Sequence, residues 1–251
     1  MFSKSTIKYI QSLQHKKFRD EYNVFVAEGP KVVTELLLAN IFPCKAVYAV
    51  QDWFDGLDKN ITRLIEGRSN TVKDFELEKI AHYANANKVL AVFGKKPANE
   101  RVSFKQKLTL LLDGIQDPGN FGTIIRTADW FGIENIICSN NTVDMYNPKV
   151  VQSTMASLGR VNILYTDLQT CIKNAAGIPK FAATLKGKPL QQIGFTHEGL
   201  IIIGNESKGI SAEIIELADE QISVPGSGSA ESLNAAIATG IILYALKTKV
   251  P

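Results

Sequence analysis

Cysteine and histidine are scarce in this sequence, which contains three of each among 251 residues. Cys44, Cys138 and Cys171 are odd in number and form no CxxC pair, which argues against a disulfide framework and against a structural zinc site. The histidines, at positions 15, 82 and 197, do not have the spacing of metal ligands. We therefore expect no metal site.

Long apolar runs are also missing. No segment provides the roughly 18 consecutive apolar residues that a membrane span needs. The most apolar stretch, Leu233 to Leu246, is short and is interrupted by Asn234, Thr239 and Gly240. The first residues lack the apolar run and the small-residue cleavage site of a secretory signal. With 45% hydrophobic and 21% charged residues, the composition predicts a soluble, cytoplasmic protein with a well-supplied core.

Positive charge is concentrated at the N-terminus. Residues 1–31 contain six Lys and Arg against three Asp and Glu, an excess that equals the net charge of +3 for the whole chain. This pattern fits a solvated helix face, and it also fits a basic arm that contacts phosphates; charge alone leaves both interpretations open. The candidate RNA-binding side chains of this segment are Lys4, Lys8, Lys16, Lys17 and Arg19.

A polar stretch divides the chain into two halves. We predict a first domain of residues 1–95, a linker of residues 96–107 and a second domain of residues 108–251. The first half reads as a small α/β domain, although residues 61–72 give no clear pattern. Its expected elements are an amphipathic segment at 6–18, a strand at 23–27, a helix from Pro30, and strands at 45–50 and 89–93.

The second half alternates short apolar runs with helical stretches, which predicts a parallel sheet covered by helices on both faces. In such sheets ligands bind at the carboxyl ends of the strands. The expected strands are residues 108–112, 135–138, 180–184, 200–203 and 221–224, with a weaker one at 161–164.

Three segments with polar residues follow these strands. In the first, Arg126 projects from a helix whose apolar residues lie on roughly the opposite side. In the second, a buried strand leads into Glu206, and Ser211 is expected to cap the next helix. In the third, a Gly/Ser loop leads into a helix expected near Ser232, with Asn234 in its first turn. That helix is apolar almost all round, so we expect it to be buried in the domain or against a second subunit.

The Gly/Ser loop imitates a dinucleotide-binding loop without completing it. Gly226 and Gly228 match the first two glycines of GxGxxG, but the third position is Glu231, whose charge repels a pyrophosphate. A nicotinamide-dependent oxidoreductase is therefore disfavoured.

Together the three segments resemble the SpoU/TrmH family of RNA 2′-O-ribose methyltransferases, part of the knotted SPOUT superfamily. The resemblance spans residues 108–246. Its motifs are Asn120-x-Gly122-x-x-x-Arg126-Thr127-Ala128, Gly204-Asn205-Glu206-x-x-Gly209-x-Ser211 and Ser232-Leu233-Asn234. The first half is similar to the family's ribosomal-protein-like substrate-binding domain, through Ile7–Leu13, Lys16–Arg19 and Phe25-Val26-Ala27-Glu28-Gly29.

This resemblance implies a fold, a cofactor and a set of site residues. The expected fold is α/β, with a C-terminal parallel-sheet domain that contains a trefoil knot, preceded by a small α/β substrate-binding domain. The implied cofactor is S-adenosylmethionine, and the implied assembly is a homodimer formed through the knotted domain. The catalytic candidates are Asn120, Arg126, Glu206, Ser232 and Asn234. The candidate cofactor-binding residues are Thr184, Leu185, Gly204, Asn205, Glu206, Val224 and Leu233.

The implied function is methylation of a ribose 2′-hydroxyl. Family proposals let the arginine activate the hydroxyl, but a guanidinium is a poor proton acceptor. Arg126 is better suited to hold a phosphate and to stabilise the developing alkoxide. Glu206 would orient Arg126, while Ser232 and Asn234 would place the ribose or the cofactor.

Two alternatives remain beside this interpretation. A non-catalytic RNA-binding protein with the same fold predicts the loss of Arg126, Glu206 or Asn234, and all three are present. A relative acting on tRNA has the same motifs; the extra N-terminal domain and its basic start favour ribosomal RNA.

Overall fold

A computed structural model describes residues 3–82, 87–97 and 102–247. Two compact units make up the chain, and one segment departs from the predicted domain ranges. Residues 144–159 lie within the sequence range of the predicted second domain, yet they pack with the first unit. Residues 98–101 of the predicted linker lie outside the described residues. The first unit comprises Met1–Pro97 and Asp144–Gly159; the second comprises Ala98–Val143 and Arg160–Pro251.

The first unit is built around a four-stranded sheet in the order β1-β4-β2-β3. Strand β4 runs antiparallel to both β1 and β2, while β3 runs parallel to β2. Its elements are α1 (Lys4–Ser12), α2 (Lys16–Glu21), β1 (Val24–Glu28), α3 (Pro30–Ala39), β2 (Cys44–Ala49), α4 (Gln51–Asp55), α5 (Lys59–Leu64), β3 (Ser69–Thr71), α6 (Asp74–Glu78), β4 (Val89–Gly94), α8 (Pro148–Ser153) and the 3-10 helix η1 (Ser157–Gly159).

Local chemistry explains where the helices of this unit begin and end. Ser3 caps α1 by accepting the N–H of Thr6 at 3.0 Å. Pro30 occupies the first turn of α3, as predicted, and Asn40 ends that helix in the left-handed conformation. The amphipathic opening segment forms two helices, α1 and α2.

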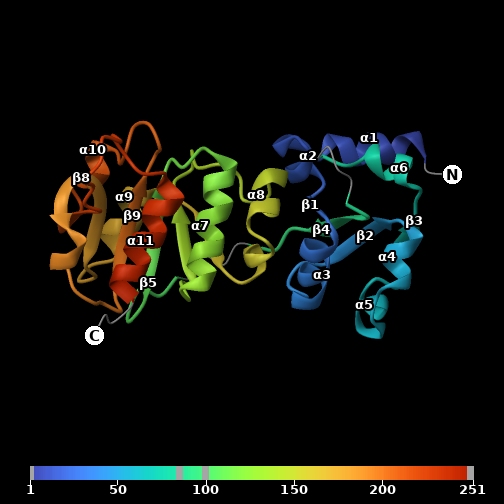
Figure 1. Ribbon diagram of the computed structural model, residues 1–251, viewed down its shortest axis with the longest axis horizontal. Coiled ribbons are helices and arrows are strands. Elements are labelled where there is room, and N and C mark those ends of the chain that lie inside the picture. The colour runs from blue at the N-terminus through green and yellow to red at the C-terminus, as the bar shows by residue number, and fades with distance from the viewer. Residues whose placement is uncertain (1–2, 83–86, 98–101, 248–251) are drawn as a thin grey trace. The chain divides into compact units, whose positions relative to one another are not determined.

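The second unit contains a six-stranded sheet in the order β10-β8-β9-β5-β6-β7, and every pairing in it is parallel. All six predicted strands are present, so the predicted parallel sheet is confirmed. Its elements (Figure 1) are β5 (Leu108–Asp113), α7 (Pro118–Trp130), β6 (Asn135–Cys138), β7 (Asn162–Tyr165), α9 (Leu168–Asn174), β8 (Lys180–Pro189), η2 (Leu190–Gln192), β9 (Gly199–Gly204), α10 (Ala212–Ile215), β10 (Glu220–Ser223) and α11 (Ala235–Lys247).

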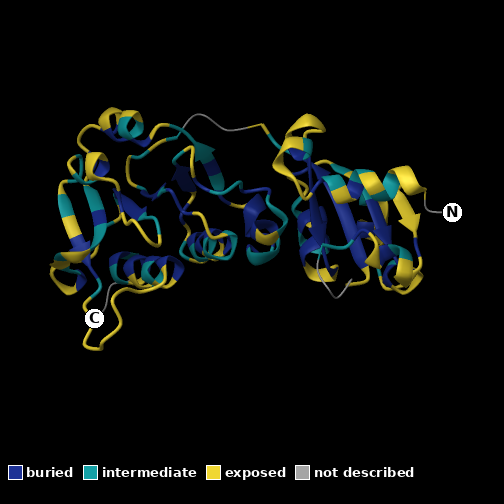
Figure 2. Cartoon of the chain, turned by 90° about the horizontal axis from the view of Figure 1, so that it is seen from above, coloured by how far each residue is buried: buried dark blue, intermediate teal, exposed yellow. Residues whose placement is uncertain are grey.

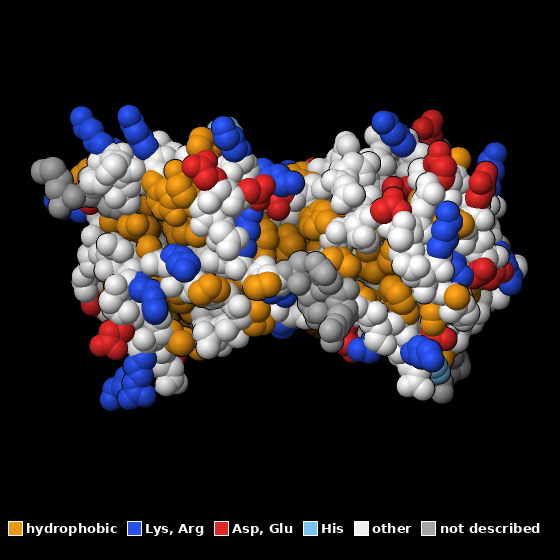
Figure 3. Space-filling view, turned by 180° about the vertical axis from the view of Figure 1, so that it is seen from behind, with side chains coloured by type: hydrophobic (Ala, Val, Ile, Leu, Met, Phe, Trp, Pro, Cys, Tyr) orange, Lys and Arg blue, Asp and Glu red, His pale blue; other side chains and the backbone are white. Residues whose placement is uncertain are grey.

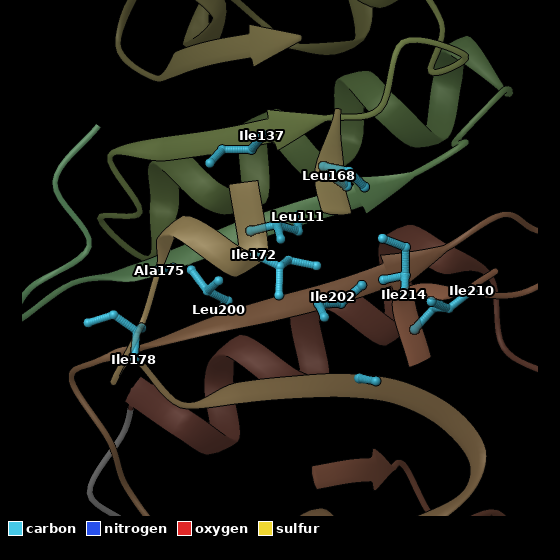
Figure 4. Close-up of a cluster of buried hydrophobic side chains, with 11 residues drawn as sticks. Leu111, Ile137, Leu168, Ile172, Ala175, Ile178, Leu200, Ile202, Ile210 and Ile214 are labelled. Carbon is cyan, nitrogen blue, oxygen red and sulfur yellow. The ribbon is translucent and has the colours of Figure 1, made fainter. Parts of the chain in front are cut away.

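Helices cover both faces of this sheet, also as predicted. Helices α7 and α11 pack together on one face, and α9 and α10 lie on the other (Figures 1 and 2). On the second face, Leu168 and Ile172 of α9 meet side chains of the central strands such as Leu111 and Ile202, all at most 3% exposed (Figure 4). The central strands are buried on both faces, which is why their sequences read as continuous apolar runs. Within the described residues, no helix combines the length and hydropathy of a membrane span.

Arg19 is buried inside the first unit. Its side chain is 2% exposed, and its guanidinium donates to Asp144 Oδ2 at 2.6 Å and to the carbonyl oxygens of Leu13 and Gln14 at 2.9 and 2.7 Å. These bonds fix the segment that begins at Asp144 to the end of α1 and to α2. The prediction that Arg19 contacts RNA is therefore wrong, because its hydrogen-bonding capacity is used within the fold.

Candidate active site at the carboxyl ends of the parallel strands

Three segments far apart in the sequence meet where the parallel strands end. After β5, Pro118 occupies the first turn of α7, and the Asp117 carboxylate caps that helix by accepting the N–H of Asn120 at 2.8 Å. After β9, the chain turns at Glu206. Before α11, Asn234 Oδ1 accepts the N–H groups of Ala236 and Ile237 at 2.9 and 3.3 Å.

A directional chain of hydrogen bonds joins these segments. Asn234 Nδ2 donates to Asn120 Oδ1 at 2.8 Å, and Asn120 Nδ2 donates to Glu206 Oε1 at 2.9 Å. An ionised carboxylate only accepts, so Glu206 fixes which way the Asn120 amide points; Asn120 in turn fixes the Asn234 amide. Three of the five predicted catalytic residues are thus connected.

The Glu206 carboxylate also faces the start of α7. The backbone N–H groups of Gln116 and Asp117 point at its two oxygens, each at 3.4 Å. These contacts are long, but the positive end of a helix dipole favours a negative charge there. Glu206 is exposed, so the carboxylate is held in place while solvent still reaches it.

Arg126 and Ser232 stand apart from this chain. Arg126 is exposed on α7, six residues beyond Asn120 or about 9 Å along the helix axis. Among the described residues its guanidinium has no hydrogen-bond or ion-pair partner, so the expected contact with Glu206 is absent. The prediction that the last helix begins near Ser232 is wrong: α11 begins at Ala235, and Ser232 lies in the exposed loop before it.

The loop after β9 is fixed from both sides. Asn205 Nδ2 donates to the Gly114 carbonyl oxygen at 2.7 Å, and its Oδ1 accepts the N–H groups of Ser207 and Lys208. A side chain at Gly204 is excluded, because a Cβ there would lie 2.3 Å from backbone atoms of Gly209. The glycine of the motif is therefore required by the close approach of two backbone segments.

Ser211 has a different function from the predicted helix cap. Although it precedes α10, its hydroxyl makes no capping bond; both its Oγ and its N–H donate to Asp113 Oδ2 at 2.8 Å. Sequence reasoning missed Asp113 and the capping residue Asp117. The available signal was an acidic residue directly after a buried strand and another directly before a proline at a helix start.

The predicted cofactor-binding residues lie on or after three strands, β10, β8 and β9, that are neighbours in the sheet. Thr184 and Leu185 lie within β8, Gly204 ends β9 with Asn205 and Glu206 directly after it, Val224 follows β10, and Leu233 lies in the loop before α11. The pairing of β8 with β10 jumps from Ala182–Gln221 to Lys188–Ile222, so residues 183–187 leave the regular ladder. Within them, Thr184 Oγ1 is buried without a hydrogen-bond partner among the described residues. Leu185 and Leu233 are 73% and 47% exposed, and Val224 is half-buried.

A separate shallow cavity of about 270 Å³ lies at the ends of β5, β6 and β7. It is lined by polar side chains that include Asp113, Ser139 and Asp167, and by none of the predicted cofactor-binding residues. No group of three metal-binding side chains occurs within the described part of the chain.

The central position of Asn120 leads to a first prediction. Asn120→Ala removes the link between Asn234 and Glu206 and is expected to lower kcat about a hundredfold, because catalytic geometry is sensitive to misplacements of about 1 Å. Turnover and thermal unfolding are measured together. The control is Thr123→Ala, one turn further on the exposed side of α7, which loses only a bond to its own helix. If both variants have equal, small effects on turnover, the hydrogen bonds from Asn234 through Asn120 to Glu206 do not position catalytic groups.

Comparisons with known proteins agree with this architecture. The family model of the SpoU rRNA Methylase family matches residues 107–244, and that of the MRM3-like substrate binding domain matches residues 4–91. The chain is 31% identical to the 23S rRNA (guanosine(2553)-2′-O)-methyltransferase RlmP of Bacillus subtilis over 96% of this chain and 95% of that protein.

Solved structures agree as well. An AdoMet-bound rRNA methyltransferase from Sinorhizobium meliloti superimposes with a TM-score of 0.86 at 29% identity, covering 98% of this chain and 95% of that one. The SpoU methyltransferase AviRb from Streptomyces viridochromogenes, in complex with AdoMet, gives 0.83 at 25% identity with 97% of each chain covered. The chain therefore belongs to the SpoU rRNA methylase family and carries an MRM3-like substrate-binding domain in front of its methylase domain.

Proposed function

We propose that this protein transfers a methyl group from S-adenosylmethionine to a ribose 2′-hydroxyl of ribosomal RNA. The observation that carries the proposal is the hydrogen-bonded chain from Asn234 through Asn120 to Glu206. It joins the three family motifs, and three of the candidate cofactor-binding residues, Gly204, Asn205 and Glu206, belong to the second of these motifs. Two proteins that are similar to this one over nearly its whole length are named as rRNA methyltransferases, which favours rRNA over tRNA as the substrate.

The residues around the strand ends fit the cofactor. Thr184 offers a buried hydroxyl that has no hydrogen-bond partner within the described residues, and the Gly204–Glu206 turn is fixed by the Asn205 side chain, which donates to the Gly114 carbonyl oxygen. S-adenosylmethionine, when bound, supplies an activated methyl group, so the protein has to align the reactants and exclude water. We assign the cofactor contacts to Thr184, Leu185, Gly204, Asn205, Glu206, Val224 and Leu233.

The exposed arginine supplies the positive charge of the site. Arg126 carries a positively charged guanidinium with a planar fork of N–H donors. It is free to bind a phosphate of the RNA and to stabilise the alkoxide that develops at the 2′-oxygen. Asn120, Asn234 and Glu206 hold the neighbouring segments, and we assign Ser232, in the exposed loop, to the ribose or the cofactor.

We further propose a homodimer, formed through a knotted second unit. The knot is supported by the close approach of two distant segments at Gly187, where a Cβ would lie 2.6 Å from backbone atoms of Gln221 and Ile222. The dimer is supported by an apolar surface on α7 and α11. Trp130, Ile237, Ile241 and Tyr244 are 85%, 56%, 39% and 54% exposed there.

This apolar surface gives a second prediction. Ile237→Glu is expected to convert a dimer into a monomer, because it buries an unpaired charge in the proposed contact. Light scattering after size-exclusion chromatography measures the mass. Leu38→Glu, at a leucine of α3 that is 53% exposed, is the matched control and is expected to leave the mass unchanged. A wild-type chain that is monomeric across the accessible concentrations contradicts the proposed assembly.

The choice of RNA is tested directly with tritiated S-adenosylmethionine. Label should enter ribosomal RNA from a strain that lacks this protein, and gel sizing separates rRNA from tRNA. Label in tRNA alone would favour the tRNA alternative; cofactor binding without transfer to any RNA would argue against the proposed substrate. We place the protein in the cytoplasm, which its three free cysteines fit.

A further inference from the structure

Four aromatic rings follow one another along α1 and α2. The Tyr9 and Tyr22 rings meet edge to face with centroids 5.1 Å apart. The Phe18 and Tyr22 rings are nearly parallel, at 14° and 6.5 Å. His15 meets Phe18 edge to face at 6.4 Å. We call Tyr9, Tyr22, Phe18 and His15 the aromatic row.

The aromatic row is open to solvent. Tyr22 is 46% exposed, His15 is exposed, and Tyr9 and Phe18 are half-buried. Because neighbouring rings hold one another in place, an incoming planar group meets rings that lose little side-chain freedom on contact. An ordinary core explains buried rings, but it does not explain rings arranged at the surface.

Exposed lysines accompany these rings on the same two helices. Lys4, Lys8, Lys16 and Lys17 are all exposed, and the Lys17 ammonium lies 5.8 Å from the centroid of the Phe18 ring. On the face in Figure 3, Lys and Arg side chains lie on both units, so positive charge alone does not mark a binding site. Rings interleaved with cations bind the two chemical parts of a nucleotide, the base by stacking and the phosphate by charge.

We propose that the aromatic row stacks on unpaired bases of the RNA substrate, while Lys4, Lys8, Lys16 and Lys17 contact the adjoining phosphates. In a duplex the faces of the bases are covered by their neighbours, so only a loop, bulge or single strand offers a free face. The first unit therefore selects RNA with unpaired nucleotides over continuous duplex. This inference rests on the proposed function, since it takes RNA as the substrate.

The test measures binding of the full chain to two labelled RNAs by fluorescence anisotropy: a hairpin with an unpaired loop, and the blunt-ended duplex of its stem. Wild-type protein should prefer the hairpin. Tyr22→Ala should weaken hairpin binding about tenfold, the effect of one lost base–aromatic stack, without changing duplex binding. Tyr22→Phe, which keeps the ring, should restore hairpin binding. Tyr22 is chosen over the half-buried Phe18 because its truncation disturbs less packing.

Two controls separate stacking from charge and from general exposure. Lys17→Ala should weaken binding to both the hairpin and the duplex and should reduce the salt dependence of binding. Tyr22→Ala should leave the salt dependence unchanged. Phe75→Ala removes an exposed ring of α6 that also has a lysine above it, at 5.0 Å, and should have no effect. Equal losses for Tyr22→Ala and Phe75→Ala, or equal losses on hairpin and duplex, overturn the proposal.

The methyl-transfer assay keeps this outcome distinct from the proposed function. If the wild-type protein methylates rRNA but Tyr22→Ala binds the hairpin as tightly as the wild type, the stacking proposal is wrong and the proposed function stands. If Tyr22→Ala weakens hairpin binding but the wild-type protein transfers no methyl group to RNA, the proposed reaction is wrong and the stacking proposal stands.

Discussion

Arg126→Ala is expected to remove almost all methyl transfer, lowering kcat by about 10²–10³-fold, while the fold and cofactor binding stay intact. The loss follows from removing the charge that stabilises the alkoxide in the transition state. The fold is spared because Arg126 is exposed and has no partner among the described residues. Single-turnover kinetics and S-adenosylmethionine binding are the measurements.

The control for this prediction removes another exposed cation of the same unit. Lys173, in the last turn of α9, lies on the opposite face of the sheet. Lys173→Ala should retain wild-type kcat, and Arg126→Lys, which keeps the charge but loses the planar fork, should recover only part of the activity. Full activity of Arg126→Ala would remove this residue from the mechanism.

Arg19→Ala is expected to lower the free energy of unfolding by about 3–5 kcal/mol. The substitution leaves Asp144, whose side chain is 13% exposed, without its buried ion-pair partner, and leaves two carbonyl oxygens without a donor. Chemical denaturation followed by circular dichroism measures the effect. Because Asp144 starts the segment that returns to the first unit, limited proteolysis should also cut residues 144–159 faster.

Two further variants decide whether the buried pair is responsible. Lys16→Ala, at an exposed lysine of the same helix, should change the stability by less than about 0.5 kcal/mol. The double variant Arg19→Ala with Asp144→Ala should be more stable than Arg19→Ala alone, since no unpaired charge remains. If Arg19→Ala is as stable as Lys16→Ala, the pair does not hold this segment.

Much of the second unit was predictable because its strands are buried on both faces. All six strands appear in the sequence as apolar runs, because a strand that is buried on both faces needs apolar side chains at successive positions. Their order was not predictable from periodicity, because neighbours in the sheet such as β9 and β5 are about ninety residues apart in sequence. Strand β3, three exposed residues, and the adjoining α5 account for the unclear pattern at 61–72. These two elements have too few buried positions to produce a hydrophobic periodicity in the sequence.

The candidate site was predictable as a set of residues but not as a geometry. Asn120, Glu206 and Asn234 were named through the family motifs, and each follows a strand end. Their hydrogen bonds depend on how three loops meet, which local pattern does not encode. Arg19 was wrongly grouped with Lys16 and Lys17, since charge spacing does not show which cation meets a carboxylate 125 residues later.

The position of the transferred methyl group tests the central claim most directly. Wild-type protein is incubated with tritiated S-adenosylmethionine and ribosomal RNA from a strain that lacks it, and the RNA is then digested to nucleosides. The account predicts that the label elutes with a 2′-O-methylnucleoside and that its rate of incorporation falls about 10²–10³-fold when Arg126→Ala replaces the wild type. Label on a base-methylated nucleoside would contradict it.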